Sequence, residues 1–223
     1  MIPLAPGLVL LLAVPARADL PLPEIVQALR AGGHVIYFRH GATDWRQSDD
    51  REALARDERR LSDCALQRNL SEEGHAQARA IGAGLRDLAI PIGAVLSGPF
   101  CRCLETARIA FGAVTVEPNL IYHVIRRLRS AAEGDAVIVE LRRRLAAMPP
   151  PGVNTVIAGH HGNLLNATGV TIDESGAAIF RPDGSGGFAL VGTVRPEEWL
   201  ASAVGVAPPS ATCAGGADGC TDR

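Results

Sequence analysis

The stretch Val35-Ile36-Tyr37-Phe38-Arg39-His40-Gly41-Ala42-Thr43 decides the fold class, because an apolar run ends abruptly in a cation, an imidazole and a glycine. The run predicts a buried strand, and strand ends are where open α/β sheets bind ligands. Arg39 offers a planar fork of donors that suits a phosphate, and His40 is a nitrogen nucleophile that is neutral near pH 7. Gly41 permits a sharp turn and a close backbone approach to a ligand. The tripeptide alone is equally consistent with a histidine that only ends a strand, because short motifs often match by chance.

Composition describes one ordinary globular domain. The chain has 223 residues, of which 47% are hydrophobic and 21% charged, and its formal charge is -2. This length is enough for a full hydrophobic core. The chain contains no lysine, which excludes Schiff-base chemistry and a P-loop. The slightly negative charge gives no electrostatic case for binding nucleic acid.

The first 18 residues resemble a secretory signal peptide. Residues 8–14 form a short apolar segment, and Ala16-Arg17-Ala18 is a small-x-small cleavage site. The n-region lacks Lys and Arg, and an uncleaved membrane anchor is the alternative, although the apolar segment is short for one. We expect a mature domain over 19–203, exported to the periplasm or outside the cell and not stably inserted in a membrane. The tail over 204–223 is predicted to be disordered.

Five cysteines bear on the same question of compartment, since disulfides form in exported proteins. They are Cys64, Cys101, Cys103, Cys213 and Cys220. The last two could pair locally, and Cys64 could pair with either Cys101 or Cys103. Their spacing does not match a zinc site. A structural disulfide is therefore favoured over a metal, with its connectivity left open.

Predicted strands alternate with predicted helices along the chain. Helices are expected over 22–31, from a Ser71 cap onward, and over 102–111, 137–147 and 197–203; strands are expected over 35–38, 94–96, 114–116, 155–158, 177–180 and 187–194. The polar stretch 42–69 is interpreted either as a functional or mobile loop or as a solvated surface loop. The alternation predicts a layered α/β fold with a mostly parallel sheet.

Three of the predicted strands end in polar groups of one kind. These are Arg39 and His40 after the first, Ser97 and Arg102 after the second, and His160 and His161 after the third. In a parallel sheet with crossover helices such ends lie along the same edge. Two arginines and two histidines are therefore expected to converge.

Four motifs in order resemble those of the histidine phosphatase superfamily, which has a phosphoglycerate-mutase-like fold. The first is the Arg-His-Gly segment at 39–43, and the second, at 97–107, is similar to S-x-P-x-x-R-x-x-x-T-A. The third is Gly159-His160 after an apolar strand, and the stretch 70–78 resembles L-[ST]-x-x-G-x-x-Q-A. The resemblance extends from about Gly33 to Thr193. It implies a three-layer α/β/α fold with a mostly parallel central sheet.

The resemblance also implies a reaction and the residues that perform it. His40 would take the phosphoryl group from a phosphomonoester, while Arg39, Arg102 and His160 would hold its equatorial oxygens. Such a transition state spreads charge over those oxygens, so catalysis is mainly positioning and electrostatic stabilisation. We expect no metal and no cofactor, because the arginines supply the positive charge. The expected partner is a small phosphorylated substrate, and the oligomeric state stays open.

Several other polar residues are candidates with a competing structural interpretation. Thr43, Arg46 and Asn163 are predicted to contact the substrate, although Thr43 could be a turn residue, Arg46 could face solvent and Asn163 could cap a helix. His161 is expected to point away from the site. His34 and His75 are expected to be structural or on the surface, and His123 is undecided.

The general acid is the departure from the family pattern. The resemblance leads us to expect a glutamate in an L-x-E context, where this chain has Leu120-Ile121-Tyr122. The candidate carboxylates are Glu133, Asp135, Asp44 and Glu105. A missing acid would slow the release of poor leaving groups by typically about 10²–10⁴-fold. The alternative to a phosphatase is a catalytically weak phosphate-binding or signalling domain on the same fold, and an intramolecular mutase is least favoured.

Overall fold

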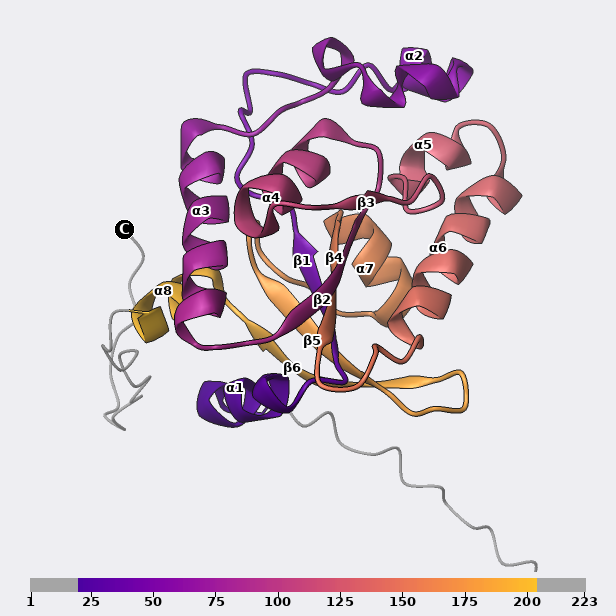
Figure 1. The fold of residues 1–223 in the computed structure, drawn as a ribbon. Coiled ribbons are helices and arrows are strands. Elements are labelled where there is room, and N and C mark those ends of the chain that lie inside the picture. Colours follow the sequence, from indigo (N-terminus) through magenta and orange to yellow (C-terminus); the bar gives the residue numbers. More distant parts are fainter. Residues whose placement is uncertain (1–19, 204–223) are drawn as a thin grey trace, which may run out of the picture.

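A six-stranded sheet forms the centre of the molecule in a computed structural model that describes residues 20–203 (Figure 1). The strands are β1 (Val35–Arg39), β2 (Ile92–Ser97), β3 (Thr115–Val116), β4 (Asn154–Gly159), β5 (Ala177–Pro182) and β6 (Phe188–Val194). Their order is β3-β2-β4-β1-β5-β6. β4 pairs in parallel with both β1 and β2, and β2 pairs in parallel with β3. β5 pairs antiparallel with both β1 and β6. The predicted signal peptide (1–18) and tail (204–223) lie outside the described residues.

Helices cover both faces of this sheet. One apolar cluster packs α1 (Leu22–Ala31), α3 (Glu72–Asp87), α4 (Cys101–Phe111) and α8 (Pro196–Ala203) against one face. A second packs α6 (Ala131–Leu145) and α7 (His161–Thr168) against the other. The predicted α/β fold with a mostly parallel sheet between helical layers is confirmed, because strands with two apolar faces need a helical cover on each. Within residues 20–203, no helix is both long and apolar enough to cross a bilayer.

Two parts of the secondary structure differ from the expectation. The stretch 42–69 is not irregular throughout, since it holds α2 (Arg51–Arg56) and two short 3₁₀ helices, η1 (Glu58–Ser62) and η2 (Cys64–Leu66). α6 begins at Ala131, earlier than predicted, because Ser130 caps it by accepting a hydrogen bond from the Glu133 N–H. Its small first residues give little apolar periodicity, so the pattern alone hid this start. The short helices α5 (His123–Arg127) and α7 were not predicted.

The register of the sheet brings the predicted strand ends together. Arg39 of β1 lies opposite Gly159 of β4, and Ser97 of β2 lies opposite Ala158. His40 and His160 therefore follow neighbouring strands at one edge of the sheet, as the strand pattern predicted.

Gly41 makes a close approach, but to a helix rather than to a ligand. A Cβ at this position would lie 2.8 Å from the carbonyl oxygen of Gly74 in α3. The Gly41 N–H donates to the Thr106 hydroxyl of α4 over 3.0 Å. The glycine thus lets the turn after β1 pack between two helices, which fixes the backbone beside His40.

Candidate active site

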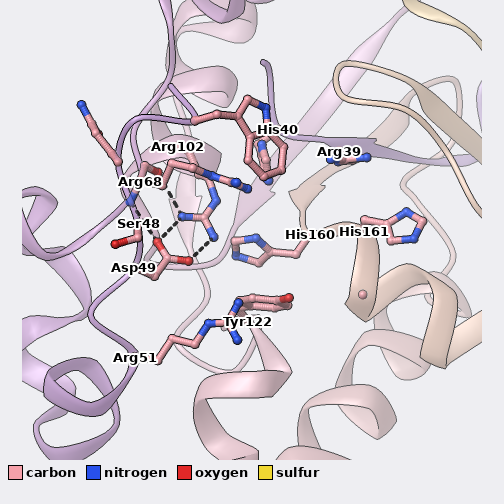
Figure 2. Close-up of a pocket in the computed structure, with 13 residues that line it drawn as sticks. Arg39, His40, Ser48, Asp49, Arg51, Arg68, Arg102, Tyr122, His160 and His161 are labelled. Carbon is pink, nitrogen blue, oxygen red and sulfur yellow. Dashed lines mark hydrogen bonds and ion pairs between the residues drawn. The ribbon is translucent and has the colours of Figure 1, made fainter. Parts of the chain in front are cut away.

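The strand ends open into a pocket of about 530 Å³ (Figure 2). Its lining includes Arg39, His40, Trp45, Asp49, Arg51, Arg68, Arg102, Tyr122, His160 and His161. Figure 2 shows the side chains of His40, Arg102 and His160 turned toward a common space, with Asp49 bonded to Arg102. The predicted convergence of two arginines and two histidines is present in the structure. Pockets of this size hold small molecules.

His40 is buried and its tautomer is set by the backbone. Its Nδ1 lies 2.9 Å from the Gly41 carbonyl oxygen, which can only accept, so Nδ1 carries the proton and Nε2 keeps a free lone pair. Burial, together with the Arg102 and Arg39 guanidiniums, lowers the pKa of His40 to about 3. The imidazole is therefore neutral near pH 7, as attack on an electrophile requires.

Arg39 and Arg102 flank this histidine, and each is held by a carboxylate. Asp49 grips Arg102 with both oxygens, at 2.9 Å to Nη1 and 3.2 Å to Nη2. The two side chains are only 2% and 8% exposed. Glu174 lies 3.3 Å from Nη2 of Arg39, whose Nη1 donates to the Ile172 carbonyl. Both guanidiniums are thus fixed in orientation before any ligand binds.

Three of the arginines that line the pocket share one unusual feature. The Nε atoms of Arg39, Arg68 and Arg102 are buried, and none has a hydrogen-bond partner within the described residues. A buried donor without a partner costs about 1–3 kcal/mol. The three guanidiniums line the pocket of His40, so a bound anion with several oxygens would offset the cost of gathering them there.

His160 forms the wall opposite His40, with ring centroids 5.5 Å apart. Burial, then the positive charge of Arg102, lowers the pKa of His160 well below its usual value, so the ring is neutral in this state. A neutral His160 offers one ring N–H at most. Tyr122 stacks on the ring with centroids 4.6 Å apart, and the buried thiol of Cys103 lies 3.5 Å from Nε2.

Part of the pocket comes from the 44–69 segment, the chain between the turn after β1 and the start of α3. It supplies Trp45, Asp49, Arg51 and Arg68 to the lining. A disulfide between Cys64 and Cys101 ties the segment to the start of α4. Of the two pairings left open for Cys64, the structure has the one with Cys101 and leaves Cys103 free. The sequence offered only a charge-dense run as a signal for these residues.

Three predicted substrate contacts lie outside the pocket lining. The hydroxyl of Thr43 donates to Glu174 over 3.1 Å, which places it behind the carboxylate that holds Arg39. Arg46 is 90% exposed and pairs with Asp44. The amide of Asn163 is buried: its oxygen accepts from the His123 N–H at the start of α5, and its nitrogen donates to the Ile121 carbonyl. Asn163 thus joins α7 to α5.

The acid candidates are placed differently from the expectation. His161 is part of the pocket lining, but Figure 2 shows its ring turned away from His40, Arg102 and His160. None of the four candidate carboxylates lines the pocket: Asp44 pairs with Arg46, Glu105 with His75, Glu133 with Arg129 and Asp135 with Arg127. Tyr122 stands in the pocket at the position where the family resemblance leads us to expect a glutamate. Asp49 is the carboxylate of the lining, and both of its oxygens are bound to Arg102.

Comparisons with known proteins agree with this geometry. Residues 35–137 match the sequence model of the histidine phosphatase superfamily (branch 1), a range that includes Arg39, His40 and Arg102 but ends before His160. Comparison with curated protein sequences finds no significant match.

Solved structures share the fold at low sequence identity. An alpha-ribazole phosphatase from Shigella flexneri is 13% identical with a TM-score of 0.51, over 73% of this chain and 96% of that one. The protein histidine phosphatase SixA in complex with tungstate is 19% identical with a TM-score of 0.47, over 73% and 97%. A phosphoserine phosphatase from Entamoeba histolytica with 3-phosphoglyceric acid is 14% identical with a TM-score of 0.47, over 75% and 99%.

The family model and the fold indicate the same candidate site. The match covers the Arg-His-Gly turn and the arginine of α4, and the sheet register adds His160 from β4. Residues 35–137 are thus similar in sequence to the histidine phosphatase superfamily (branch 1), and the described chain shares its fold with an alpha-ribazole phosphatase.

Proposed function

We propose that the protein is a phosphatase that hydrolyses a small phosphomonoester through a phosphohistidine at His40. One observation carries the proposal: Arg39, Arg68 and Arg102 line the same pocket as a buried, neutral histidine. A phosphoryl group has oxygens for these donors and a phosphorus atom for the nucleophile.

The first chemical step forms a P–N bond and breaks the ester P–O bond. Nε2 of His40 attacks phosphorus. Arg39 and Arg102 stabilise the growing negative charge on the equatorial oxygens by donating hydrogen bonds to them. The leaving oxygen departs with the bonding electron pair and takes a proton from solvent water. A water molecule then attacks the phosphohistidine, which releases inorganic phosphate and restores neutral His40.

The choice of leaving group follows from the pocket lining. The one carboxylate among the described residues that line it, Asp49, has both oxygens engaged by Arg102. A carboxylic acid is thus not available to protonate a basic leaving oxygen. We therefore expect aryl and acyl phosphates to react faster than alkyl phosphates, since proton donation matters most for a basic leaving group.

Metal independence and export are part of the same proposal. The positive charge that a metal supplies in other phosphoryl-transfer sites comes here from arginines. The disulfide between Cys64 and Cys101 supports export, because such bonds persist in oxidising compartments. Mass spectrometry of the mature protein would show cleavage before Asp19 if the predicted signal is used.

The test is an assay of the purified full chain against a panel of phosphomonoesters in excess EDTA. We expect turnover that EDTA leaves intact, and a rapid quench should trap an acid-labile, base-stable phosphoryl adduct on His40. His40→Ala should abolish both while the protein stays folded by circular dichroism. An adduct on serine or cysteine would contradict the mechanism, as would a metal requirement. Phosphate binding without turnover would favour the phosphate-binding domain instead.

A further inference from the structure

Arg68 stands in the pocket beside the two arginines that the strand ends supply. Its guanidinium carbon lies 3.7 Å from the ring centroid of Trp45, so the indole supports it from one side. Figure 2 shows Arg68 on the same side of the pocket as Asp49, across from His161. Arg68 is close enough to His40 for its charge to help lower the pKa of that imidazole.

The structural contacts of Arg68 use its backbone rather than its side chain. The Arg68 N–H donates to Oδ1 of Asp49 over 2.9 Å, and the Arg68 carbonyl accepts from Nη1 of Arg102 over 3.1 Å. These bonds hold the end of the 44–69 segment whatever side chain the residue carries. The guanidinium makes no ion pair within the described residues, and its Nε is buried without a partner. The side chain is therefore not explained by the packing of the segment.

The position of this guanidinium is unfavourable without an anion. Burial, and then the charge of Arg102 and of Arg39, lowers the pKa of Arg68 below its usual value. The protein thus places a third cation against two others at a cost in free energy. Such a cost is offset when a ligand with negative charge binds between them.

The charge balance of the site indicates how much negative charge this ligand carries. The pocket is lined by the four arginines Arg39, Arg51, Arg68 and Arg102. Two carboxylates, Asp49 and Glu174, pair with Arg102 and Arg39. His40 and His160 are neutral. Two positive charges remain. They match the dianion of a phosphate monoester, whereas a diester or another monoanion would leave one charge uncompensated.

We propose that Arg68 is a third phosphate-holding arginine, which contacts the substrate's phosphoryl oxygens through its guanidinium and selects dianionic monoesters over monoanions. This proposal rests on the proposed function. It assigns the 44–69 segment a direct part in binding, because Arg68 is carried by that segment and not by a strand end. Trp45 acts as a positioning residue that keeps the guanidinium over the pocket.

The experiment measures binding of inorganic phosphate at pH 8, where it is a dianion, by calorimetry on the full chain. Arg68→Gln should weaken phosphate binding about 10- to 100-fold, the usual size for one charge-assisted hydrogen bond. Arg68→Lys should fall between this variant and the wild type, because it keeps the charge and loses the Nε–H. The matched control is Arg59→Gln, an arginine of the same segment that is 91% exposed and pairs with Asp57. It should bind phosphate within about twofold of the wild type.

A second ligand pair tests the charge selectivity at the same pH. Sulfate and perchlorate are tetrahedral and differ by one charge, so Arg68→Gln should weaken sulfate binding more than perchlorate binding. Phosphate affinity of Arg68→Gln equal to that of Arg59→Gln, with wild-type turnover intact, would overturn the role of Arg68 and leave the proposed function standing. A wild type that neither binds phosphate nor turns over would instead remove the proposed function. If Arg68→Gln fails to fold, an unchanged Arg68→Lys overturns the proposal equally.

Discussion

The two halves of the pocket are built in different ways. The strand-end half, formed by Arg39, His40, Arg102 and His160, follows β1, β2 and β4, and the hydrogen-bonded register of the sheet sets its geometry. The 44–69 segment contributes its residues from short helices and turns. It is held by side-chain bonds and by one disulfide. The first half is positioned by regular structure, and the second by specific contacts.

The two halves therefore have different roles in the proposed reaction. In the proposed mechanism the strand-end half holds the nucleophile and two arginines, so it contains the groups that the chemical step needs. The segment completes the site from outside, because Asp49 orients Arg102 and Arg68 adds charge. Catalysis should therefore depend on the strand ends more steeply than on the segment. Variants in each half test that ranking.

The largest effect is expected where the two halves meet, at the pair of Arg102 and Asp49. Arg102→Gln removes a guanidinium that holds phosphate in the proposed mechanism and should lower kcat/KM by about 10²–10³-fold, the usual cost of one lost oxyanion donor. It also leaves the Asp49 carboxylate unpaired in a buried site, where it would repel the substrate. Steady-state kinetics with an aryl phosphate measure the loss.

A double-mutant cycle separates these two causes. Adding Asp49→Asn to Arg102→Gln should recover part of the lost kcat/KM, because it removes the repelling carboxylate. Asp49→Asn alone should lower kcat/KM, since Arg102 then loses its orienting partner. Strictly additive effects would show that the two side chains act independently, contrary to their bidentate contact.

The strand-end half could be predicted because sheet geometry converts sequence order into spatial order. An apolar run followed by Arg39 and His40 predicts a strand end, and parallel pairing brings His160 to the same edge. The Ser71 cap of α3 is a local signal of the same kind, as its hydroxyl accepts from the Gly74 N–H. These features need only short-range information or a repeated topology.

The segment could not be predicted, because its contacts join residues that no periodicity relates. Gln67 is an example: its amide nitrogen donates to the Leu61 carbonyl, and its oxygen accepts from the Cys101 N–H. Three aspartates cap its short helices, at Asp50, Asp57 and Asp63, within a run that looks only charged. Pairing of Cys64 with Cys101 rather than Cys103 depends on which side of α4 faces the segment. The sequence does not indicate which side of α4 this is.

Removing the disulfide should affect the segment more than the strand ends. A covalent link between residues 37 apart in sequence stabilises the fold by about 2–4 kcal/mol, mainly by restricting the unfolded chain. Cys64→Ser with Cys101→Ser should lower the free energy of unfolding by that amount in urea denaturation. Phosphate affinity should also fall, because the link helps to hold Asp49 and Arg68 over the pocket.

The control for this prediction is the reductant. Dithiothreitol should bring the wild type to the stability of the double variant and leave the double variant unchanged. Equal stability of oxidised and reduced wild type would show that side-chain bonds, including those of Gln67, hold the segment without the disulfide.

The last effect concerns the protonation of His40. The pKa of His40 is about 3 in the folded protein against 6.5 in the unfolded chain, because burial and the charges of Arg102, Arg39 and Arg68 disfavour the charged ring. Below pH 6.5 the unfolded chain therefore takes up a proton that the folded protein does not. The stability due to neutral His40 is complete above pH 6.5 and falls as the pH drops toward 3, by about 1.4 kcal/mol per pH unit. His40→Asn should make the acid-side decline of the unfolding free energy shallower by that amount when urea denaturation is repeated from pH 7 to pH 4. An unchanged slope in this variant would mean that His40 takes up the proton as readily in the folded protein as in the unfolded chain, contrary to its lowered pKa.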